Sequence, residues 1–162
     1  MTRVGLVSDT HGLLRPEVLA FLEGCDAIVH AGDICEAEVL DALNAIAPVT
    51  AVRGNNDRGA WAKRLRVHEE LTIDGVRIHV VHDLADLAPR GRRAHARNAV
   101  APPGARVVVS GHSHRPVIDE RDGVLFVNPG SAGPRRFNLP IACGELMIRD
   151  HSVSARIARP CE

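Results

Sequence analysis

Two histidines that lie two residues apart, His112 and His114, are the residues of this sequence best suited to chemistry. They follow an apolar run at 107–109 that predicts a buried strand, and Gly111 immediately precedes them. In extended backbone, residues i and i+2 point the same way, so both imidazoles could reach one place beyond the strand. Neutral imidazole is a common metal ligand. Such pairs also occur on ordinary surfaces, so the metal hypothesis depends on the rest of the chain.

Polar residues that could bind a metal also follow other apolar runs directly. These further positions are Asp9 and His11, Asp33, Asn55 and Asp57, His82, and Asn128. In open α/β sheets, ligands bind beyond the carboxyl ends of the strands. If the apolar runs are neighbouring strands, their polar clusters therefore converge on one edge. Residues without a shared function would also be found on helix faces and at strand starts.

The chemistry of these groups favours a centre with two metal ions. The set contains two carboxylates, one amide oxygen and four imidazoles, from Asp9, His11, Asp33, Asn55, His82, His112 and His114. These are too many ligands for one ion and suit two ions that share a bridge. Asp33 is the natural bridging candidate, and the mixed nitrogen and oxygen ligands favour transition metals over Mg²⁺ or Ca²⁺. Two ions ~3.5–4 Å apart can hold a hydroxide and clamp a phosphoryl group for in-line attack.

The elements that must position these groups alternate between strand and helix up to about residue 57. We expect strands at 3–7, 27–29 and 49–52, and helices at 13–23 and about 36–45. This pattern predicts a parallel sheet covered by helices.

The second half has a different pattern. The Asp-Gly pair at 74–75 predicts a type I′ hairpin turn, and the pair at 122–123 predicts a second hairpin. Residues 84–101 predict a helix or an irregular crossover, with a break near 89–91. The expected strands are 67–73, 76–81, 107–109, 116–120, 124–127, 142–149 and 153–157. We expect residues 1–162 to form a single domain.

The composition is that of an ordinary globular protein. Of the 162 residues, 45% are hydrophobic and 25% charged, and the formal net charge is +0. No overall field therefore attracts nucleic acid or a membrane surface, and 2% aromatic residues provide few stacking platforms. The four cysteines form no Cys-x-x-Cys pair. With neither a secretory signal nor an apolar membrane span in the sequence, we expect a cytoplasmic protein with reduced thiols.

Taken in order, the polar clusters resemble the motifs of the calcineurin-like metallophosphoesterases. The matching motifs are Asp9-x-His11, Gly32-Asp33, Gly54-Asn55-x-Asp57, His82 after a strand, and Gly111-His112-x-His114. Their order and spacing cover nearly the whole chain. Together with Asn128-Pro-Gly-Ser131 and the small size, they make the sequence most similar to the compact prokaryotic phosphodiesterase branch.

This resemblance implies an α/β fold of two packed mixed β-sheets flanked by α-helices. It implies one metal held by Asp9, His11, Asp33 and His114, and another held by Asp33, Asn55, His82 and His112. Asp33, Asn55 and His112 would be the catalytic residues. The implied cofactors are two divalent ions, Mn²⁺ foremost, with Fe, Ni, Zn or Co as alternatives. The substrate would be a small phosphate ester attacked by a metal-bridging hydroxide, and a homo-oligomer is expected.

Two positions depart from the family pattern. Protein phosphatases of the superfamily have Gly-Asn-His-Glu, whose histidine protonates the leaving group, where this chain has Gly54-Asn55-Asn56-Asp57. Asn56 cannot act as a general acid, which disfavours protein phosphatase activity. The family usually has glycine after the fourth motif, where this chain has Asp83. That carboxylate either orients a ligand histidine or turns to solvent.

Other roles and other functions stay open at the level of sequence. Asn56 and Arg58 are candidate substrate-binding residues, whereas Asp57 and Asn128 are expected to support the ligands from behind. Asp9 and Asp33 could also be simple helix caps. A phosphomonoesterase is one alternative function. A non-catalytic scaffold is another, because a branch of this fold serves as a subunit of membrane-trafficking coats.

Overall fold

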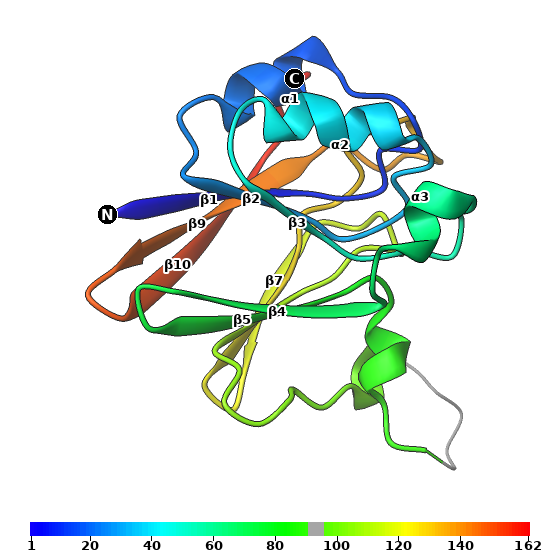
Figure 1. The fold of residues 1–162 in the computed structure, drawn as a ribbon. Helices are drawn as coiled ribbons and strands as arrows, with labels where there is room; N and C mark the ends of the chain where they lie inside the picture. Colours follow the sequence, from blue (N-terminus) through cyan, green and yellow to red (C-terminus); the bar gives the residue numbers. More distant parts are fainter. Residues whose placement is uncertain (91–95) are drawn as a thin grey trace.

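The computed structural model describes residues 1–90 and 96–162, which contain two five-stranded sheets packed face to face (Figure 1). The first sheet has the order β10 (Ser152–Ala158), β9 (Cys143–Arg149), β1 (Thr2–Val7), β2 (Ala27–His30) and β3 (Val49–Ala51). The second has the order β4 (His68–Ile73), β5 (Val76–Val81), β6 (Val107–Val109), β8 (Val124–Asn128) and β7 (Val117–Arg121). Both sheets are mixed.

The strands that precede the polar clusters are the parallel strands of each sheet. In the first sheet β1, β2 and β3 are parallel, whereas β9 and β10 are antiparallel to their neighbours. In the second sheet β5, β6 and β8 are parallel, and β4 and β7 are antiparallel additions at the two edges. Polar residues that follow parallel strands lie at the same end of a sheet, which is the arrangement that the site requires.

Alternating strand residues fill the space between the sheets. Val4 and Leu6 of β1 and Ile78 and Val80 of β5 are fully buried in one apolar cluster. Residues two apart in a strand point to one face, so this spacing places both pairs in the core. Burial of each such side chain stabilises the fold by about 1.5–3 kcal/mol. The core thus holds together the two sheets that carry the polar clusters.

The helices cover the first sheet. Helices α1 (Pro16–Leu22) and α2 (Ala37–Asn44) lie over its outer face, and Val18, Leu22 and Leu43 pack beneath them (Figure 1). On the outer face of the second sheet, Leu84 and Leu87 of the 3-10 turn η1 (Leu84–Leu87) pack against the buried cluster that contains Phe126. A second 3-10 turn is η2 (Ala96–Asn98). The predicted pair of mixed sheets is therefore confirmed, with α-helices flanking the first sheet within the described residues.

Most element predictions are confirmed, with two corrections. The helix predicted from residue 13 begins at Pro16, because a proline at the first helical position suits the helix start. Helix α3 (Ala60–Lys63) was not predicted, since four residues are too few to show a helical period. The segment 84–101 is an irregular crossover in its described parts, and the predicted break at 89–91 lies partly outside the described residues.

Both predicted hairpin turns have the geometry of type I′. Asp74 and Gly75 have φ values of 47° and 78°, and Asp122 and Gly123 have 51° and 77°. A type I′ turn needs positive φ at both central residues. No helix within residues 1–90 and 96–162 is long and apolar enough to cross a membrane.

Candidate metal centre

The ends of six strands, three from each sheet, meet at one edge of the molecule. Backbone hydrogen bonds join the loops that follow them: Asp9 N–H donates to the Gly32 carbonyl at 3.0 Å, and Gly111 N–H donates to the His82 carbonyl at 2.9 Å. The first bond joins the loops after β1 and β2, and the second joins the loops after β6 and β5. The expected convergence of the polar clusters is therefore present.

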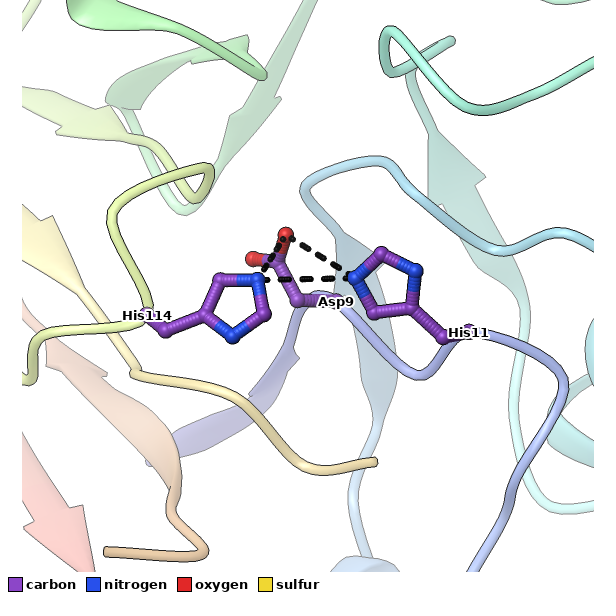
Figure 2. Close-up of side chains that lie close together, drawn as sticks. All are labelled: Asp9, His11 and His114. Carbon is purple, nitrogen blue, oxygen red and sulfur yellow. Dashed lines mark hydrogen bonds and ion pairs between the residues drawn. The ribbon is translucent and has the colours of Figure 1, made fainter. Parts of the chain in front are cut away.

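Asp9, His11 and His114 form the first set of neighbouring side chains, here named the buried donor group (Figure 2). Asp9 Oδ1 lies 3.2 Å from His114 Nε2 and 3.9 Å from His11 Nε2. The two Nε2 atoms lie 3.4 Å apart. The side chains of Asp9, His11 and His114 are 0%, 12% and 7% exposed. Three atoms of the kinds that bind metal ions thus face one another in a place that is almost closed to solvent.

Asn55, His82 and His112 form the second set, here named the open donor group. Asn55 Oδ1 lies 2.9 Å from His82 Nε2 and 3.1 Å from His112 Nδ1. The side chain of His82 is 4% exposed, whereas that of His112 is 47% exposed. This group therefore has one side accessible to solvent.

Asp33 lies between the two groups. Its Oδ1 is 3.4 Å from His82 Nε2 in the open group, and its Oδ2 is 3.7 Å from His11 Nε2 in the buried group. The backbone N–H and the side-chain amide of Asn56 donate to the two oxygens at 2.9 and 2.8 Å. Burial opposes ionisation, but hydrogen bonds from His82 and Asn56 outweigh it and hold the pKa of Asp33 well below its usual value. Asp33 is therefore a fixed, ionised carboxylate that faces both groups.

The hydrogen bonding of His82 fits a bound cation. Its Nδ1 lies 2.7 Å from the Ala31 carbonyl and donates to it, so Nε2 faces the oxygens of Asn55 and Asp33. Two acceptors around one ring nitrogen are satisfied only by a proton or a metal ion. Burial opposes a charge on the ring, but the hydrogen bond to Asp33 and the carboxylates of Asp9 and Asp33 raise the pKa of His82. The site therefore attracts positive charge to this point.

Asp9 gives the same indication for the buried group. Its Oδ1 is fully buried and makes no hydrogen bond of acceptable geometry to the described residues. Its Oδ2 accepts from the Ser8 hydroxyl at 2.6 Å and from the His112 backbone N–H at 3.1 Å. An unpaired buried carboxylate oxygen is costly unless a cation satisfies it. The mixed nitrogen and oxygen atoms of both groups fit divalent transition metals.

The loop that carries His112 and His114 is turned rather than extended. Both residues have positive φ, 68° and 61°. The assumption that they share one side of extended backbone is therefore wrong. The His112 ring lies 5.2 Å from the His82 ring, whereas the His114 ring lies 5.4 Å from the His11 ring. The two histidines thus belong to different donor groups.

Backbone strain is concentrated at this edge. Asp9, His11 and Asp33 also have positive φ, between 46° and 57°. Each such non-glycine residue costs roughly 1–3 kcal/mol and persists only where the surroundings hold it. Hydrogen bonds of Asp57, His30 and Asn128 hold the loops that contain these residues.

Asp57 anchors the loop of Asp33 from behind. Its carboxylate accepts backbone N–H bonds from Asp33 at 3.0 Å, Ile34 and Cys35 at 2.8 Å, and Gly54 at 2.7 Å. The loops after β2 and β3 are thereby joined through one buried side chain. The structure places Asp57 in a supporting position and not in either donor group.

His30 joins the loops after β1 and β2. Its Nδ1 accepts from Gly32 N–H at 3.1 Å, and its Nε2 lies 2.9 Å from the Thr10 hydroxyl. Burial lowers the pKa of His30 to about 3, so the ring is neutral in the folded protein. His30 supports the loops that carry Asp9 and Asp33 and contributes no ligand atom to either donor group.

Asn128 holds the loop of the two histidines. Its side-chain amide donates to the Gly111 carbonyl at 2.8 Å and to the Ser113 hydroxyl at 3.1 Å. The two predicted substrate-binding residues differ in position. Asn56 donates a hydrogen bond to Asp33 between the two donor groups, whereas Arg58 is exposed at the surface.

One contact was not predicted from the sequence, and of the two orientations expected for Asp83 the structure shows the one toward a histidine. Cys35 Sγ lies 3.5 Å from His11 Nδ1, behind the buried group, and a single cysteine outside any motif gives no signal for this contact. Asp83 Oδ1 accepts from Ala85 N–H at 3.0 Å and caps η1, while its Oδ2 lies 3.7 Å from His112 Nε2. Asp83 therefore faces a histidine of the open group.

Comparison with known proteins identifies the family. Residues 2–151 match the model of the calcineurin-like phosphoesterase superfamily domain. A probable metallophosphoesterase of Methanothermobacter thermautotrophicus is 35% identical over 96% of this chain and 91% of its own. A phosphodiesterase of Methanocaldococcus jannaschii, MJ0936, is 31% identical over 79% of this chain and 82% of its own. Vps29 of Entamoeba histolytica (single mutant D62A) has a similar structure, with a TM-score of 0.72, 25% identity and coverage of 97% and 98%. The chain belongs to the calcineurin-like phosphoesterase superfamily.

Proposed function

We propose that this protein is a phosphodiesterase whose two donor groups hold two divalent metal ions. The observation that carries this proposal is the position of Asp33, whose two oxygens face different donor groups. A relative named as a phosphodiesterase supports the choice of reaction. The proposed ligand sets are Asp9, His11, Asp33 and His114 for one ion, and Asp33, Asn55, His82 and His112 for the other.

The chain itself supplies orientation and charge. When bound, such a metal pair lowers the pKa of water and neutralises the charge of a phosphoryl group. Asn56 keeps the Asp33 carboxylate in place, and Asp57 keeps the Asp33 backbone in place. The bond from His82 to the Ala31 carbonyl fixes the tautomer in which Nε2 is free to bind a metal. Substrate approaches from the exposed side of His112, because the buried donor group is closed to solvent.

Mn²⁺ is the proposed native metal, and a small phosphate ester is the proposed substrate. The direct test compares hydrolysis of bis-p-nitrophenyl phosphate with that of p-nitrophenyl phosphate by protein loaded with Mn²⁺. We expect turnover of the diester to exceed that of the monoester and to disappear when the metal is chelated. Diester turnover that survives chelation would contradict the proposal.

The same experiment separates two other functions. Faster turnover of the monoester would indicate a phosphomonoesterase. Metal binding without turnover of either ester would favour a scaffold, a function that the structural similarity to Vps29 brings into consideration.

A further inference from the structure

A small cavity lies beside the open donor group. Its volume is about 240 Å³, and residues from η1, η2, β7, β8 and the loop after β6 surround it. Its apolar wall side chains are Leu84, Val117 and Phe126, with His112 at one end and Asp83, Arg115 and Arg121 among the remaining lining residues.

The ring of His112 separates this cavity from the proposed metal ligands. Its Nδ1 lies 3.1 Å from Asn55 Oδ1, on the side of the open donor group. Its Nε2 lies 3.7 Å from Asp83 Oδ2, and Asp83 also lines the cavity. The cavity therefore borders the open donor group directly, on the side of the His112 ring that faces away from Asn55. A group esterified to a phosphate at that site can reach it.

The lining favours a neutral, apolar occupant. The surface of the cavity is mostly apolar, with Leu84, Val117 and Phe126 as its largest apolar side chains, and the Arg121 guanidinium stacks 4.1 Å from the centre of the Phe126 ring. This stacking holds the aromatic ring in place as a rigid wall. Charged residues of both signs line the cavity, since Asp83 faces His112, Arg121 is paired with Asp119, and Arg115 lies among them, so no single charge favours an ionic occupant.

The size of the cavity limits the occupant to one ring-sized group. Pockets that bury a whole drug-sized ligand measure roughly 300–1,000 Å³, so this cavity suits a part of a ligand. We propose that it binds one neutral, apolar, ring-sized ester group of the substrate and thereby selects aryl or similar phosphodiesters. This inference rests on the proposed function, because it assigns the ester group of the same reaction.

Two neighbouring residues of the edge strand β7 provide a matched test. Val117 and Ile118 are 46% and 44% exposed, and of the two only Val117 lines the cavity. Neighbouring residues of a strand point to opposite faces, so Val117→Asp charges the cavity and Ile118→Asp charges the other face. The two variants carry the same added charge on one strand.

Binding of two phosphonates to the protein loaded with Mn²⁺ measures the preference without turnover. Phenylphosphonate has an aromatic ring on phosphorus, whereas methylphosphonate has a methyl group. Calorimetric titration gives the dissociation constant of each. We expect wild type and Ile118→Asp to bind phenylphosphonate at least about tenfold more tightly than methylphosphonate. In Val117→Asp this preference should fall to about threefold or less. An equal preference in all three proteins, or no preference in wild type, would overturn the inference.

Turnover of bis-p-nitrophenyl phosphate by the same preparations separates the two proposals. A ring preference that is lost in Val117→Asp, without any turnover by wild type, would support the cavity assignment and contradict the phosphodiesterase. Turnover by wild type without a ring preference would contradict the cavity assignment alone.

Discussion

The buried and the open donor groups use similar ligand atoms in different surroundings. His114 of the buried group is 7% exposed, whereas His112 of the open group is 47% exposed. Asp9 of the buried group has one oxygen fixed by Ser8 and by the His112 backbone. In the open group, His112 lines the apolar cavity. From this difference we propose that the buried group binds its metal ion more tightly and that the open group contacts substrate.

Asp33 faces both groups, so its substitution should weaken metal binding at both of them. Asp33→Asn removes the charge that faces both His11 and His82. We expect kcat/KM for bis-p-nitrophenyl phosphate to fall by roughly 10³-fold, or about 4 kcal/mol, and affinity for Mn²⁺ to fall at both groups. The exposed Asp41 of α2 provides the matched control, Asp41→Asn, which should leave both quantities unchanged. Wild-type metal affinity at both groups in Asp33→Asn would refute the shared role.

Asp57 supports Asp33 from behind, so its loss should weaken the fold as well as the site. Asp57→Ala leaves four backbone N–H groups without their acceptor. We expect the free energy of unfolding, measured in urea, to fall by about 3–5 kcal/mol. Asp119→Ala removes a surface carboxylate paired with Arg121 and should cost less than about 1 kcal/mol. Equal losses in the two variants would show that the Asp57 hydrogen bonds contribute little.

The two histidines of the 112–114 loop allow each donor group to be weakened separately. We expect His114→Ala to lower Mn²⁺ affinity at the tighter site and His112→Ala to lower it at the weaker site, each by about 100-fold, or 2.7 kcal/mol. Calorimetric titration of metal-free protein measures both sites. If both variants lose the same single site, the assignment of the histidines to different groups is wrong.

The buried His30 should make a smaller contribution, one that depends on pH, to the free energy of unfolding. The pKa of folded His30 is about 3, below its ordinary value of 6.5, so at mildly acid pH the unfolded chain binds the extra proton. The stability that His30 contributes is therefore present at pH 7 and is lost as the pH falls below 6.5 toward 3. Between pH 7 and pH 5 this loss amounts to roughly 2 kcal/mol.

Urea unfolding of wild type and His30→Gln at both pH values isolates this contribution. The decrease in stability should be smaller in His30→Gln by about that amount, because titration of other groups is common to both proteins. His151→Gln changes an exposed histidine and should behave like wild type. An equal decrease in wild type and His30→Gln would contradict the role assigned to burial.

Strand periodicity was sufficient to predict most of the individual elements. The apolar runs and Asp-Gly turns predicted the strands and both hairpins, because these have strong local signals, whereas the pairing of two mixed sheets was implied only by the family resemblance. Helix α3 has four residues and no such signal. The polar residues at the strand ends were also evident in the sequence, since parallel strands bring their carboxyl ends together.

Contacts between distant loops were not predictable in the same way. The sequence indicated a supporting role for Asp57, but the four N–H groups that it accepts depend on how two loops fold against each other. The cavity beside His112 is built from five separate segments, so no local pattern could indicate it. The positive φ of His112 and His114 was missed because extended backbone was assumed beyond the strand.

The central claim is that the two donor groups hold two metal ions that share Asp33. Anomalous diffraction from crystals grown with Mn²⁺ tests this claim directly, because it locates each ion independently of activity. We predict two Mn²⁺ ions ~3.5–4 Å apart, one in each donor group, with an oxygen of Asp33 bound to each. A single ion, or two ions of which one does not contact Asp33, would contradict the account.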